Sequence, residues 1–443
     1  MTTYHIGFDS TDSATKGMCT TYLGAMVLER LSGLPIELSG FPELVRLNPN
    51  VPWKTRGNGA VCLRYEGEPG LGDRIMSVSS DAVEELSVFE DPQTNPGLVL
   101  VENELDERLG SWYQRALHEI LDVEEARDMV QELGIHSRTW KNGRGAIGAL
   151  AAVGADLTAH SYEAMLYRPG SVKERERKVD IETLRNASSN HPSTFFNVDK
   201  EGEPVCIPHS PCPVILGIRG MDPGDALEAL KEVSAEGYER WVLWKTNQHT
   251  DAHIESLPDL KGAGPYSSIS VEITVIGLPG YIEGGHLIIP AEDGAGTRVD
   301  LAAYEPTKGF RKRLSELLPG DVVRIWGSIR QEDVPRPTVN LEKVDVLRIS
   351  EQIERHNPRC SKCGGPTESM GRDQGLRCKK CGYRGSDLEP LETRLKREIS
   401  RGLIEPPPDA WRHLFRPSTL PSVNEEPYEG PMWGIGHPAF EGI

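Results

Sequence analysis

The amino-acid sequence predicts a multidomain protein of mixed α/β and α+β character with a zinc ribbon near its C-terminal end. Three observations lead to this fold class. The length of 443 residues exceeds one compact core, because a domain usually takes about 100 to 200 residues. The apolar pattern changes along the chain from alternating strand-like and helical runs to short strand-like runs alone. Two Cys-x2-Cys pairs separated by 14 residues follow these runs.

Residues 1–139 are expected to form an N-terminal α/β domain. Strand-like runs such as 97–101 alternate there with helical runs such as 108–121, and Gly and Pro residues separate them. The first apolar strand carries Tyr4, Ile6 and Phe8 and ends at a polar loop. A helix is expected after this loop, over 22–31.

The loop after the first strand contains the chemically reactive residues of this domain. Asp9 and Asp12 supply hard oxygen ligands that suit Mg²⁺, which takes only one or two protein carboxylates and completes its shell with water and phosphate oxygens. Lys16 and the N-terminus of the following helix would then meet the phosphates. An acidic turn with helix-capping side chains, Thr20 included, is the alternative.

Two glycine-rich blocks beside cations are further candidates for phosphate binding, because a backbone without side chains can approach a phosphate closely. One is Arg56-Gly57-Asn58-Gly59 and the other is Lys141-Asn142-Gly143-Arg144-Gly145. Neither block matches a Walker A motif or a dinucleotide-binding fingerprint. A plain hairpin or helix-entry turn is therefore the alternative for each.

Residues 140–260 are expected to form a ferredoxin-like α+β domain. The predicted elements are a helix, two strands, a helix and a strand, over 146–150, 161–167, 214–218, 223–232 and 240–245. A polar stretch separates the first two strands. Loops of this region carry His209 and Asp251, and the prolines around His209 predict a rigid loop.

Residues 265–350 are expected to form an OB-fold, a β-barrel that commonly binds oligonucleotides. Short β-rich runs cover 268–276, 286–289, 299–303, 321–329 and 341–347, with a helix-compatible insert over 310–318. Tyr304, Phe310 and Trp326 are candidates for stacking on bases, and packing in the barrel core is the alternative for at least one of them.

Residues 355–386 are expected to form a zinc ribbon. The spacing of Cys360, Cys363, Cys378 and Cys381 is typical of two knuckles that converge on one tetrahedral zinc ion. Such a closed shell of four sulfurs leaves no open position for catalysis. Residues 387–443 are first charged and then proline-rich, which predicts a surface helix followed by an extended tail.

The overall charge limits the class of partner. With 49 Lys and Arg against 67 Asp and Glu the net charge is −18, so nucleic-acid binding would depend on local basic runs at 173–178, 308–313 and 372–384. No apolar run reaches the about 18 residues of a membrane span, and the N-terminus lacks a signal sequence. Four clustered cysteines among eight fit a reducing compartment, so a cytoplasmic protein without a membrane partner is expected.

Five segments resemble the archaeal 2-agmatinylcytidine synthetases, which act on the isoleucine tRNA with a CAU anticodon. The segments read GFDSTDS at 7–13, GMCTTY at 17–22, LVRLNPNVPWKTRGNG at 44–59, KNGRG at 141–145 and NQHTDAH at 247–253. The similarity extends from residue 4 to the cysteine cluster near residue 381. Ser10 stands where many relatives carry a third aspartate, which leaves Asp9 and Asp12 as the better candidates for a metal.

This resemblance implies an ATP-dependent carbon–nitrogen ligase that attaches agmatine to C2 of the wobble cytidine and releases AMP. Phosphorylation of the base would activate it for attack by the amine, and the product would read AUA in place of AUG. The resemblance further implies ATP, Mg²⁺ and Zn²⁺ as cofactors and an ATP-binding, kinase-like first domain in which Thr20 is autophosphorylated. The expected catalytic residues are Asp9, Asp12, Lys16 and Thr20. The expected phosphate-binding residues are Gly17, Arg56, Gly57, Asn58, Gly59, Lys141 and Arg144, and the agmatine candidates are His209 and Asp251.

Two other classes of function remain open from the sequence. One is a tRNA-binding scaffold with a regulatory nucleotide site, and the concentration of Asp, Lys and Thr in the first loop argues against it. The other is an RNA ligase or aminoacyl-transfer enzyme, because OB barrels and zinc ribbons occur there too. No recognisable adenylation motif or synthetase signature supports that second class.

Overall fold

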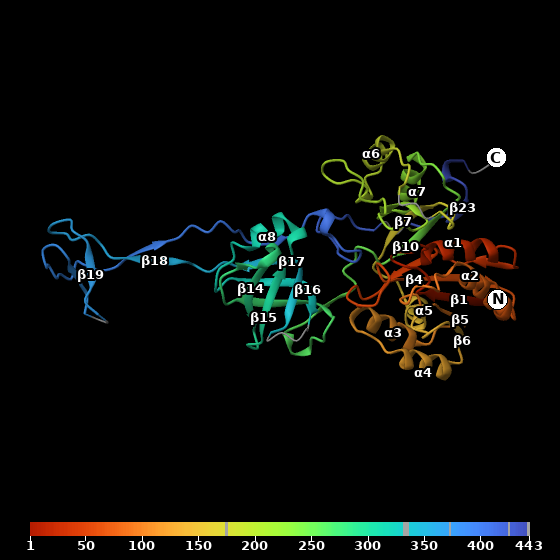
Figure 1. The fold of residues 1–443 in the computed structure, drawn as a ribbon, viewed down its shortest axis with the longest axis horizontal. Coiled ribbons are helices and arrows are strands. Elements are labelled where there is room, and N and C mark those ends of the chain that lie inside the picture. Colours follow the sequence, from red (N-terminus) through yellow and green to blue (C-terminus); the bar gives the residue numbers. More distant parts are fainter. Residues whose placement is uncertain (173–175, 331–335, 372–373, 424–425, 441–443) are drawn as a thin grey trace.

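The computed structural model describes residues 1–172, 176–330, 336–371, 374–423 and 426–440. Residues 173–175 of the first basic run, and Arg372 of the third, lie outside the described residues. Figure 1 shows a main body with both helices and strands, a separate β-barrel, and a thin arm that carries the cysteine ribbon away from the barrel. The main body contains one 11-stranded sheet, whose path runs β6-β5-β1-β4-β3-β10-β7-β9-β8 with β2 and β23 paired at its sides.

The N-terminal half of this sheet is antiparallel throughout. Its strands are β1 (Thr2–Asp9), β2 (Ile36–Leu38), β3 (Glu43–Arg46), β4 (Gly59–Gly67), β5 (Gly97–Glu102) and β6 (His136–Thr139). Its helices are α1 (Thr20–Leu31), α2 (Gly72–Leu86), α3 (Glu107–His118), α4 (Val123–Leu133) and α5 (Gly145–Gly154). Side chains of β4 alternate between two cores, with Val61 and Leu63 against α1 and α2, and Ala60 and Cys62 against α3 and α5.

Three glycines let helix α5 lie directly on the sheet. A side chain at Gly7, Gly97 or Gly145 would overlap the backbone across the contact, so these positions accept no larger residue. Helix α5 therefore belongs to the N-terminal half, although the sequence predicted it in the domain that begins at residue 140. This contact brings α5 to the end of β1, where Asp9 lies.

The second half of the sheet has the order β10-β7-β9-β8 with antiparallel pairing. Its elements in chain order are β7 (Ser161–Tyr167), α6 (Ile181–Asn190), β8 (Thr194–Phe195), β9 (Val214–Gly220), α7 (Pro223–Glu232) and β10 (Arg240–Thr246). The predicted strand over 161–167 and helix over 223–232 are confirmed at both ends. Helix α6 and strand β8 were missed, because the polar stretch between the strands hid a helix with only Leu184 and Ala187 buried.

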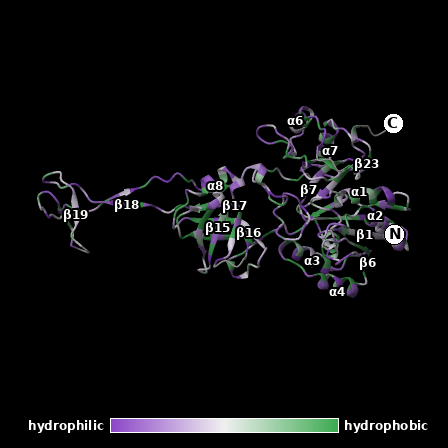
Figure 2. Ribbon diagram, in the orientation of Figure 1, coloured by the Kyte–Doolittle hydropathy of each residue, from purple (hydrophilic) through white to green (hydrophobic). Residues whose placement is uncertain are grey.

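The two halves join where β10 pairs with β3 in parallel, at Lys245 with Glu43 and Thr246 with Leu44. Helices α6 and α7 cover one face of the second half, and residues of the other face, including Tyr167 and Trp244, share a core with helix α1. Figure 2 shows hydrophobic residues along these strands and hydrophilic residues on outer helices such as α4. The two domains therefore form one continuous packed unit.

Five strands of the third region close into a barrel, because β12 pairs with β16 at one side and with β14 at the other. Its elements are β12 (Ser268–Val275), β14 (Leu287–Asp293), β15 (Arg298–Ala303), α8 (Gly309–Leu314), β16 (Val322–Arg330) and β17 (Thr338–Arg348), with β11 (Ile254–Ser256) and β13 (Gly280–Tyr281) at its edges. All five predicted strands and the inserted helix are found. Phe310 is buried in the barrel core and has no surface for a base, whereas Tyr304 is exposed and Trp326 is half-buried.

The arm and its ribbon are built from short strand pairs. These are β18 (Ile353–His356) with β21 (Leu391–Arg394), and β19 (Thr367–Ser369) with β20 (Leu376–Cys378). The predicted surface helix after residue 386 is wrong, since β21 occupies that stretch. Short 3-10 turns within the described residues lie at Leu260–Gly262, Glu283–Gly285, Glu305–Thr307, Pro408–Ala410 and Pro438–Phe440.

The C-terminal residues return to the main body as a strap, which we define as residues 402–437. Its first strand, β22 (Gly402–Ile404), pairs with β17 of the barrel, and its last, β23 (Trp433–Ile435), pairs with β10 of the large sheet. Between them Trp411 stacks against Phe415. The expected extended tail is therefore a packed connection between the barrel and the main body.

Among the described residues, no helix combines the length and hydropathy that crossing a bilayer requires.

Buried charges fix the barrel to the main body. His253 Nε2 lies 3.0 Å from Glu342 Oε2 of β17, and both side chains are buried. Next to them Lys343 forms an ion pair with Asp251 and donates to the carbonyl oxygen of Arg416 in the strap. Burial alone would raise the pKa of Glu342, but His253, together with Arg412 and Lys343, lowers this pKa to about 2.

Replacing Glu342 by Ala should lower the free energy of unfolding by about 3 to 5 kcal/mol, because it leaves His253 buried without its partner. Urea denaturation at pH 7 measures this loss. The matched control is Glu392→Ala, which breaks the exposed pair with Arg355 and should change stability by less than about 1 kcal/mol. Because its pKa is depressed, the contribution of Glu342 is present above the usual value of 4.5 and lost as pH falls toward 2. Equal losses of stability in the two variants would contradict the role of the buried pair of His253 and Glu342 in holding the barrel to the main body.

Candidate active site

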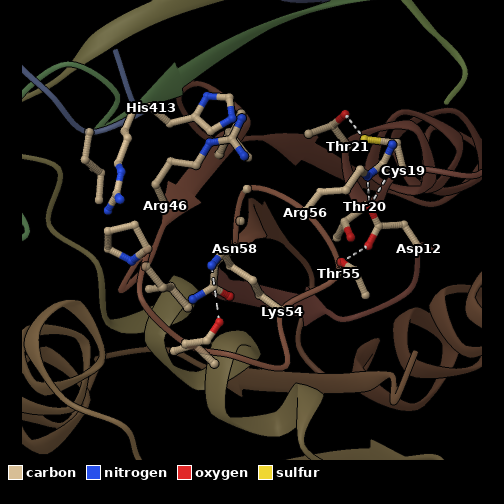
Figure 3. Close-up of a pocket in the computed structure, with 18 of the residues that line it drawn as sticks. Asp12, Cys19, Thr20, Thr21, Arg46, Lys54, Thr55, Arg56, Asn58 and His413 are labelled. Carbon is tan, nitrogen blue, oxygen red and sulfur yellow. Dashed lines mark hydrogen bonds and ion pairs between the residues drawn. The ribbon is translucent and has the colours of Figure 1, made fainter. Parts of the chain in front are cut away.

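A cavity of about 1280 Å³ lies where the N-terminal half, the second half of the sheet and the strap meet. Its walls come from residues 9–21 after β1, 44–59 around β3, 204–219 before and within β9, and 408–414 of the strap. Figure 3 shows Asp12, Cys19, Thr20 and Arg56 at one side of this pocket and Arg46 with His413 at the other. Segments that are distant in sequence thus share one cavity.

Asp12 is the most heavily bonded carboxylate of the pocket. It accepts hydrogen bonds from Thr55 Oγ1 at 2.6 Å and from Arg56 Nε at 2.7 Å, and its ion pair with Arg56 is largely buried. Arg56 also donates to the carbonyl oxygen of Met18 and, at 3.2 Å, to Ser210 Oγ. A single guanidinium therefore joins the loop after β1, the loop before β4 and the loop before β9.

Asp9 lies at the end of β1 and lines the same pocket. Burial raises the pKa of the Asp9 carboxyl to about 7, and the nearby charge of Asp12 adds to this, while the Ser10 backbone N–H and Arg144 act in the opposite direction. Its carboxyl group faces Gly148 of α5, where any side chain would overlap it. Asp9 thus titrates near neutral pH, which suits a proton acceptor or a metal ligand.

Thr20 is a buried pocket residue whose hydroxyl lies 3.1 Å from Thr11 Oγ1. The alternative that Thr20 caps its helix is wrong, since the N-cap position of α1 is Cys19 and no side chain forms the cap. The Cys19 Sγ atom instead lies 3.0 Å from Thr21 Oγ1. The N-terminus of α1 therefore presents hydroxyl groups and uncapped backbone N–H groups at the pocket.

The pocket lining includes most of the residues that the sequence singled out. These are Asp9, Asp12, Thr20, Arg56, Gly57, Asn58, Gly59, Arg144 and His209. Lys16, Gly17 and Lys141 do not line it. Lys16 Nζ donates to the carbonyl oxygen of Glu90 at 3.0 Å, and Lys141 Nζ donates to that of Asp91 at 2.6 Å. Gly17 has a φ of 100° and lies against Pro211, so it shapes the loop.

Asp251 is also outside the pocket lining, so its contact with agmatine stays a prediction. Its carboxylate pairs with Lys343 of the barrel and accepts a hydrogen bond from the backbone N–H of Arg416 at 2.7 Å. Both oxygens are thus engaged at the junction with the barrel. The sequence does not reveal this role, because the partners are about 90 and 165 residues away along the chain.

Sequence reasoning missed a deeper region of the pocket, formed by Arg46, Glu163, Arg219, His249 and His413. Gln248 connects several of these residues. Its Nε2 donates to Glu163 Oε2 at 2.5 Å, and its Oε1 accepts from Arg46 Nη2 at 3.4 Å and lies 3.1 Å from His413 Nδ1. One signal was present in the sequence, because Glu163 is a charged residue inside an otherwise apolar strand.

The two histidines of this deeper region are held neutral. Burial lowers the pKa of His249 to about 3, and the positive charge of Arg46, followed by burial, lowers that of His413 well below its usual value. Within the described residues, His249 Nε2 and Arg46 Nε are buried without a hydrogen-bond partner. Such atoms carry a desolvation cost that a polar ligand in the pocket would relieve.

The four predicted zinc ligands converge in the ribbon. The sulfur atoms of Cys360, Cys363, Cys378 and Cys381 lie within 4.8 Å of one another, a spacing that fits four thiolates around one tetrahedral ion. Backbone N–H groups of Lys380 and Cys381 point at the sulfur of Cys378, at 3.3 and 3.4 Å. The donor set and its geometry fit structural zinc.

The two carboxylates of the pocket differ in how well they fit a Mg²⁺ ion. In the described chain, no charged side chain lies within hydrogen-bonding distance of the Asp9 carboxylate oxygens. The oxygens of Asp12 are already occupied by Thr55 and Arg56, so Arg56 would have to release at least one of them to a metal ion.

A polar pocket on a large mixed sheet, a closed five-stranded barrel and a four-cysteine ribbon together are typical of modular enzymes that act on nucleic acids. Family models narrow this class. The "TiaS TCKD domain" matches residues 5–142, the "TiaS FLD domain" residues 143–253 and the "TiaS C-terminal zinc ribbon domain" residues 357–399. The chain therefore belongs to the TiaS family.

Individual relatives are similar to this chain over nearly their whole length. The chain is 38% identical to TiaS of Methanosarcina acetivorans, an isoleucine-tRNA 2-agmatinylcytidine synthetase, over 93% of this chain and 96% of that protein. It is equally similar to the Pyrococcus horikoshii protein of the same name, over 97% and 99%. A crystal structure of TiaS in complex with isoleucine tRNA and ATP superimposes with a TM-score of 0.85 at 37% identity, covering 96% of this chain and 99% of the other. A complex of TiaS with isoleucine tRNA, AMPCPP and agmatine gives 0.81 at 35% identity, over 94% and 97%.

Replacing Cys363 by Ser should remove bound zinc, because three thiolates no longer close the tetrahedral shell. Metal analysis of the purified protein should fall from one zinc per chain to well below one. Cys206→Ala is the matched control, since Cys206 is a free buried cysteine of the main body and should leave the zinc content unchanged. Full zinc occupancy in the Cys363 variant would contradict the assignment.

Proposed function

We propose that this chain is the ATP-dependent enzyme that attaches agmatine to C2 of the wobble cytidine in the isoleucine tRNA with a CAU anticodon. The product is 2-agmatinylcytidine, ATP is consumed to AMP, and the tRNA then reads AUA in place of AUG. The observation that carries this proposal is the single pocket in which Asp9, Asp12 and Thr20 face the second domain and the strap. The names of relatives that match nearly the whole chain, and the ATP, tRNA and agmatine named in related complexes, support it.

The chemistry requires an activated base, because the C2 oxygen of cytosine leaves only after phosphorylation. We assign the hydroxyl of Thr20 as the phosphate acceptor, since it lies buried in the pocket at the uncapped N-terminus of α1. Asp9 is assigned as a Mg²⁺ ligand beside that hydroxyl, and its raised pKa of about 7 means that it must release a proton before a metal ion binds. His209 remains a candidate for contact with agmatine, because it lines the cavity.

Nucleotide binding is assigned to the same wall of the pocket. Arg56, Arg144 and the segment 57–59 would bind the phosphates, and Asp9 and Asp12 would hold Mg²⁺ once Arg56 has moved to the phosphates. A bound Mg²⁺ would neutralise charge on the transferring phosphoryl group. Lys16 and Lys141 would join this set only after leaving the carbonyl groups of residues 89–91.

Finer fold names are part of the proposal. We assign a kinase-like role to residues 1–139, on whose sheet helix α5 packs, and a ferredoxin-like fold to residues 140–260, where the elements between 161 and 246 have the β-α-β-β-α-β order that supports it. The barrel from 268 to 348 is assigned as an OB-fold that binds tRNA together with the ribbon. The overall charge of −18 makes local basic surfaces the points of contact with RNA.

The experiment that tests the function is incorporation of radiolabelled agmatine into a tRNA transcript with a CAU anticodon, in the presence of Mg·ATP. Label should appear in this transcript and be absent from one that lacks only the wobble cytidine. Tight RNA binding without label, at any agmatine concentration, would contradict the proposed reaction and favour a binding protein.

Asp12→Ala should reduce incorporation by about 100-fold or more, because it removes a carboxylate from the reacting site and releases Arg56. Its affinity for the tRNA, measured by filter binding, should fall much less than its turnover, because the barrel and the ribbon are intact and only one anchor of the loop at 50–56 is lost. Normal turnover in this variant would remove Asp12 from the site.

At subsaturating Mg²⁺ the rate of incorporation should fall about tenfold per pH unit below pH 7. Asp9 must be ionised to hold Mg²⁺, and its raised pKa of about 7 means that protons compete with the metal ion below that pH. The single-turnover rate from pH 5.5 to 8.5 measures this profile, with the reaction restarted at pH 7.5 to exclude denaturation. A flat profile down to pH 5.5 would remove Asp9 from the metal site.

A further inference from the structure

Trp53 is an exposed aromatic residue at the pocket that the assigned chemistry does not use. About 36% of its surface is exposed, although large apolar side chains in this chain are mostly buried. It lines the cavity, and the guanidinium carbon of Arg144 lies 5.3 Å from the centre of its ring. Arg144 in turn interacts electrostatically with Asp9, so Trp53 is one side chain removed from the proposed reacting groups.

The loop that carries Trp53 is held at both ends. The Asn50 amide donates to Ser268 Oγ at 2.9 Å and to the carbonyl oxygen of Tyr266 at 3.0 Å, which connects the loop to the start of the barrel. On the other side, Thr55 and Arg56 bind Asp12. A residue on such a tethered loop loses little conformational entropy when a ligand binds it.

Positive charge gathers around Lys54, the residue that follows Trp53. Burial lowers the pKa of Lys54, and the positive charges of Arg412 and Arg330 lower it further. These three cations come from the main body, the strap and the barrel, and all of them line the cavity. Figure 3 shows Lys54 next to Asn58 at the lower side of the pocket. Like charges in one place repel, and a polyanion that crosses the seam between main body and barrel would relieve that repulsion.

We propose that Trp53 is a positioning residue that stacks on an RNA base next to the wobble cytidine and so holds that cytidine unstacked in the pocket. The RNA backbone at this point runs past Lys54, Arg330 and Arg412. A base that enters a pocket must leave its stack, and an aromatic side chain can replace one of the lost stacking contacts. This inference rests on the proposed function, because it takes the anticodon loop as the RNA that enters the cavity.

The adenine of ATP is the other planar base that Trp53 could contact. Arg144, which contacts the Trp53 ring, is also a proposed phosphate-binding residue and is compatible with either base. The cations that interact with the next residue, Lys54, favour RNA, since Arg330 belongs to the barrel and Arg412 to the strap. Stacking of Trp53 on an RNA base and stacking on adenine can be distinguished, because ATP affinity can be measured without RNA.

The test compares Trp53→Ala, Trp53→Phe and the wild type. Trp53→Ala should weaken binding of the tRNA transcript and raise its KM about 10- to 100-fold, which is the usual loss for one stacked base. Trp53→Phe should recover most of this loss, and ATP affinity without RNA should be unchanged in both variants. Trp140→Ala is the matched control, because Trp140 forms the same kind of pair with Arg138 at 5.3 Å but does not line the pocket, and its tRNA affinity should equal that of the wild type.

A transcript with an abasic site on either side of the wobble position completes the test. One of the two abasic transcripts should bind to the wild-type protein as weakly as the intact transcript binds to Trp53→Ala. The same abasic transcript should bind to Trp53→Ala no more weakly than the intact transcript does. Additive losses, an equal loss of ATP affinity, or unchanged tRNA affinity in Trp53→Ala would each overturn the inference. Because binding is measured without turnover, these outcomes differ from failure of the proposed reaction, in which no transcript acquires agmatine.

Discussion

The ion pair between Asp12 and Arg56 is the interaction on which the pocket depends. Arg56, in the loop before β4, contacts Asp12 and Met18 in the loop after β1 and Ser210 in the loop before β9. Three loops from three parts of the sequence therefore meet at one guanidinium group. A buried charge pair of this kind is costly to break from one side, because the remaining charge stays in a low-dielectric environment. The same pair covers the oxygens that a metal ion would use, so substrate binding and the integrity of the pocket involve the same side chains.

The strap connects the pocket to the barrel. Its β22 continues the barrel sheet, its β23 continues the main sheet, and residues 411–414 between them form part of the pocket wall. The ion pairs of Asp251 and His253 with β17 fix the same seam from the other direction. The barrel is therefore connected to the pocket through packed backbone and buried charges, and a shift of the barrel would move part of the pocket wall.

The sequence allowed good prediction where local patterning decides the structure. Strand β7 and helix α7 were predicted at both ends because a short, mostly apolar run and a helical run that begins at Pro223 are local signals. The four cysteines were likewise predicted by spacing alone. Pairings over long sequence distances left no such signal: the strap, the role of Asp251 and the contact of His413 with Gln248 each depend on partners far along the chain. The part of the pocket wall that the strap supplies, including His413, was therefore absent from the expectation.

Backbone conformation around the pocket shows how its geometry is maintained. Ser10, Met18, Asn58, Phe196 and His249 all have a positive φ between 49° and 62°, a region that costs a residue with a side chain roughly 1 kcal/mol or more. Each lies next to a fixed contact; the carbonyl oxygen of Met18 accepts from Arg56, and His249 Nδ1 lies 2.8 Å from that of Phe415. The contacts therefore offset the strain while the pocket is free of ligand. The Met18 contact is exchanged when Arg56 moves to the phosphates, whereas the contact of His249 does not involve a proposed ligand-binding residue and can lower the cost of ordering the site when substrates bind.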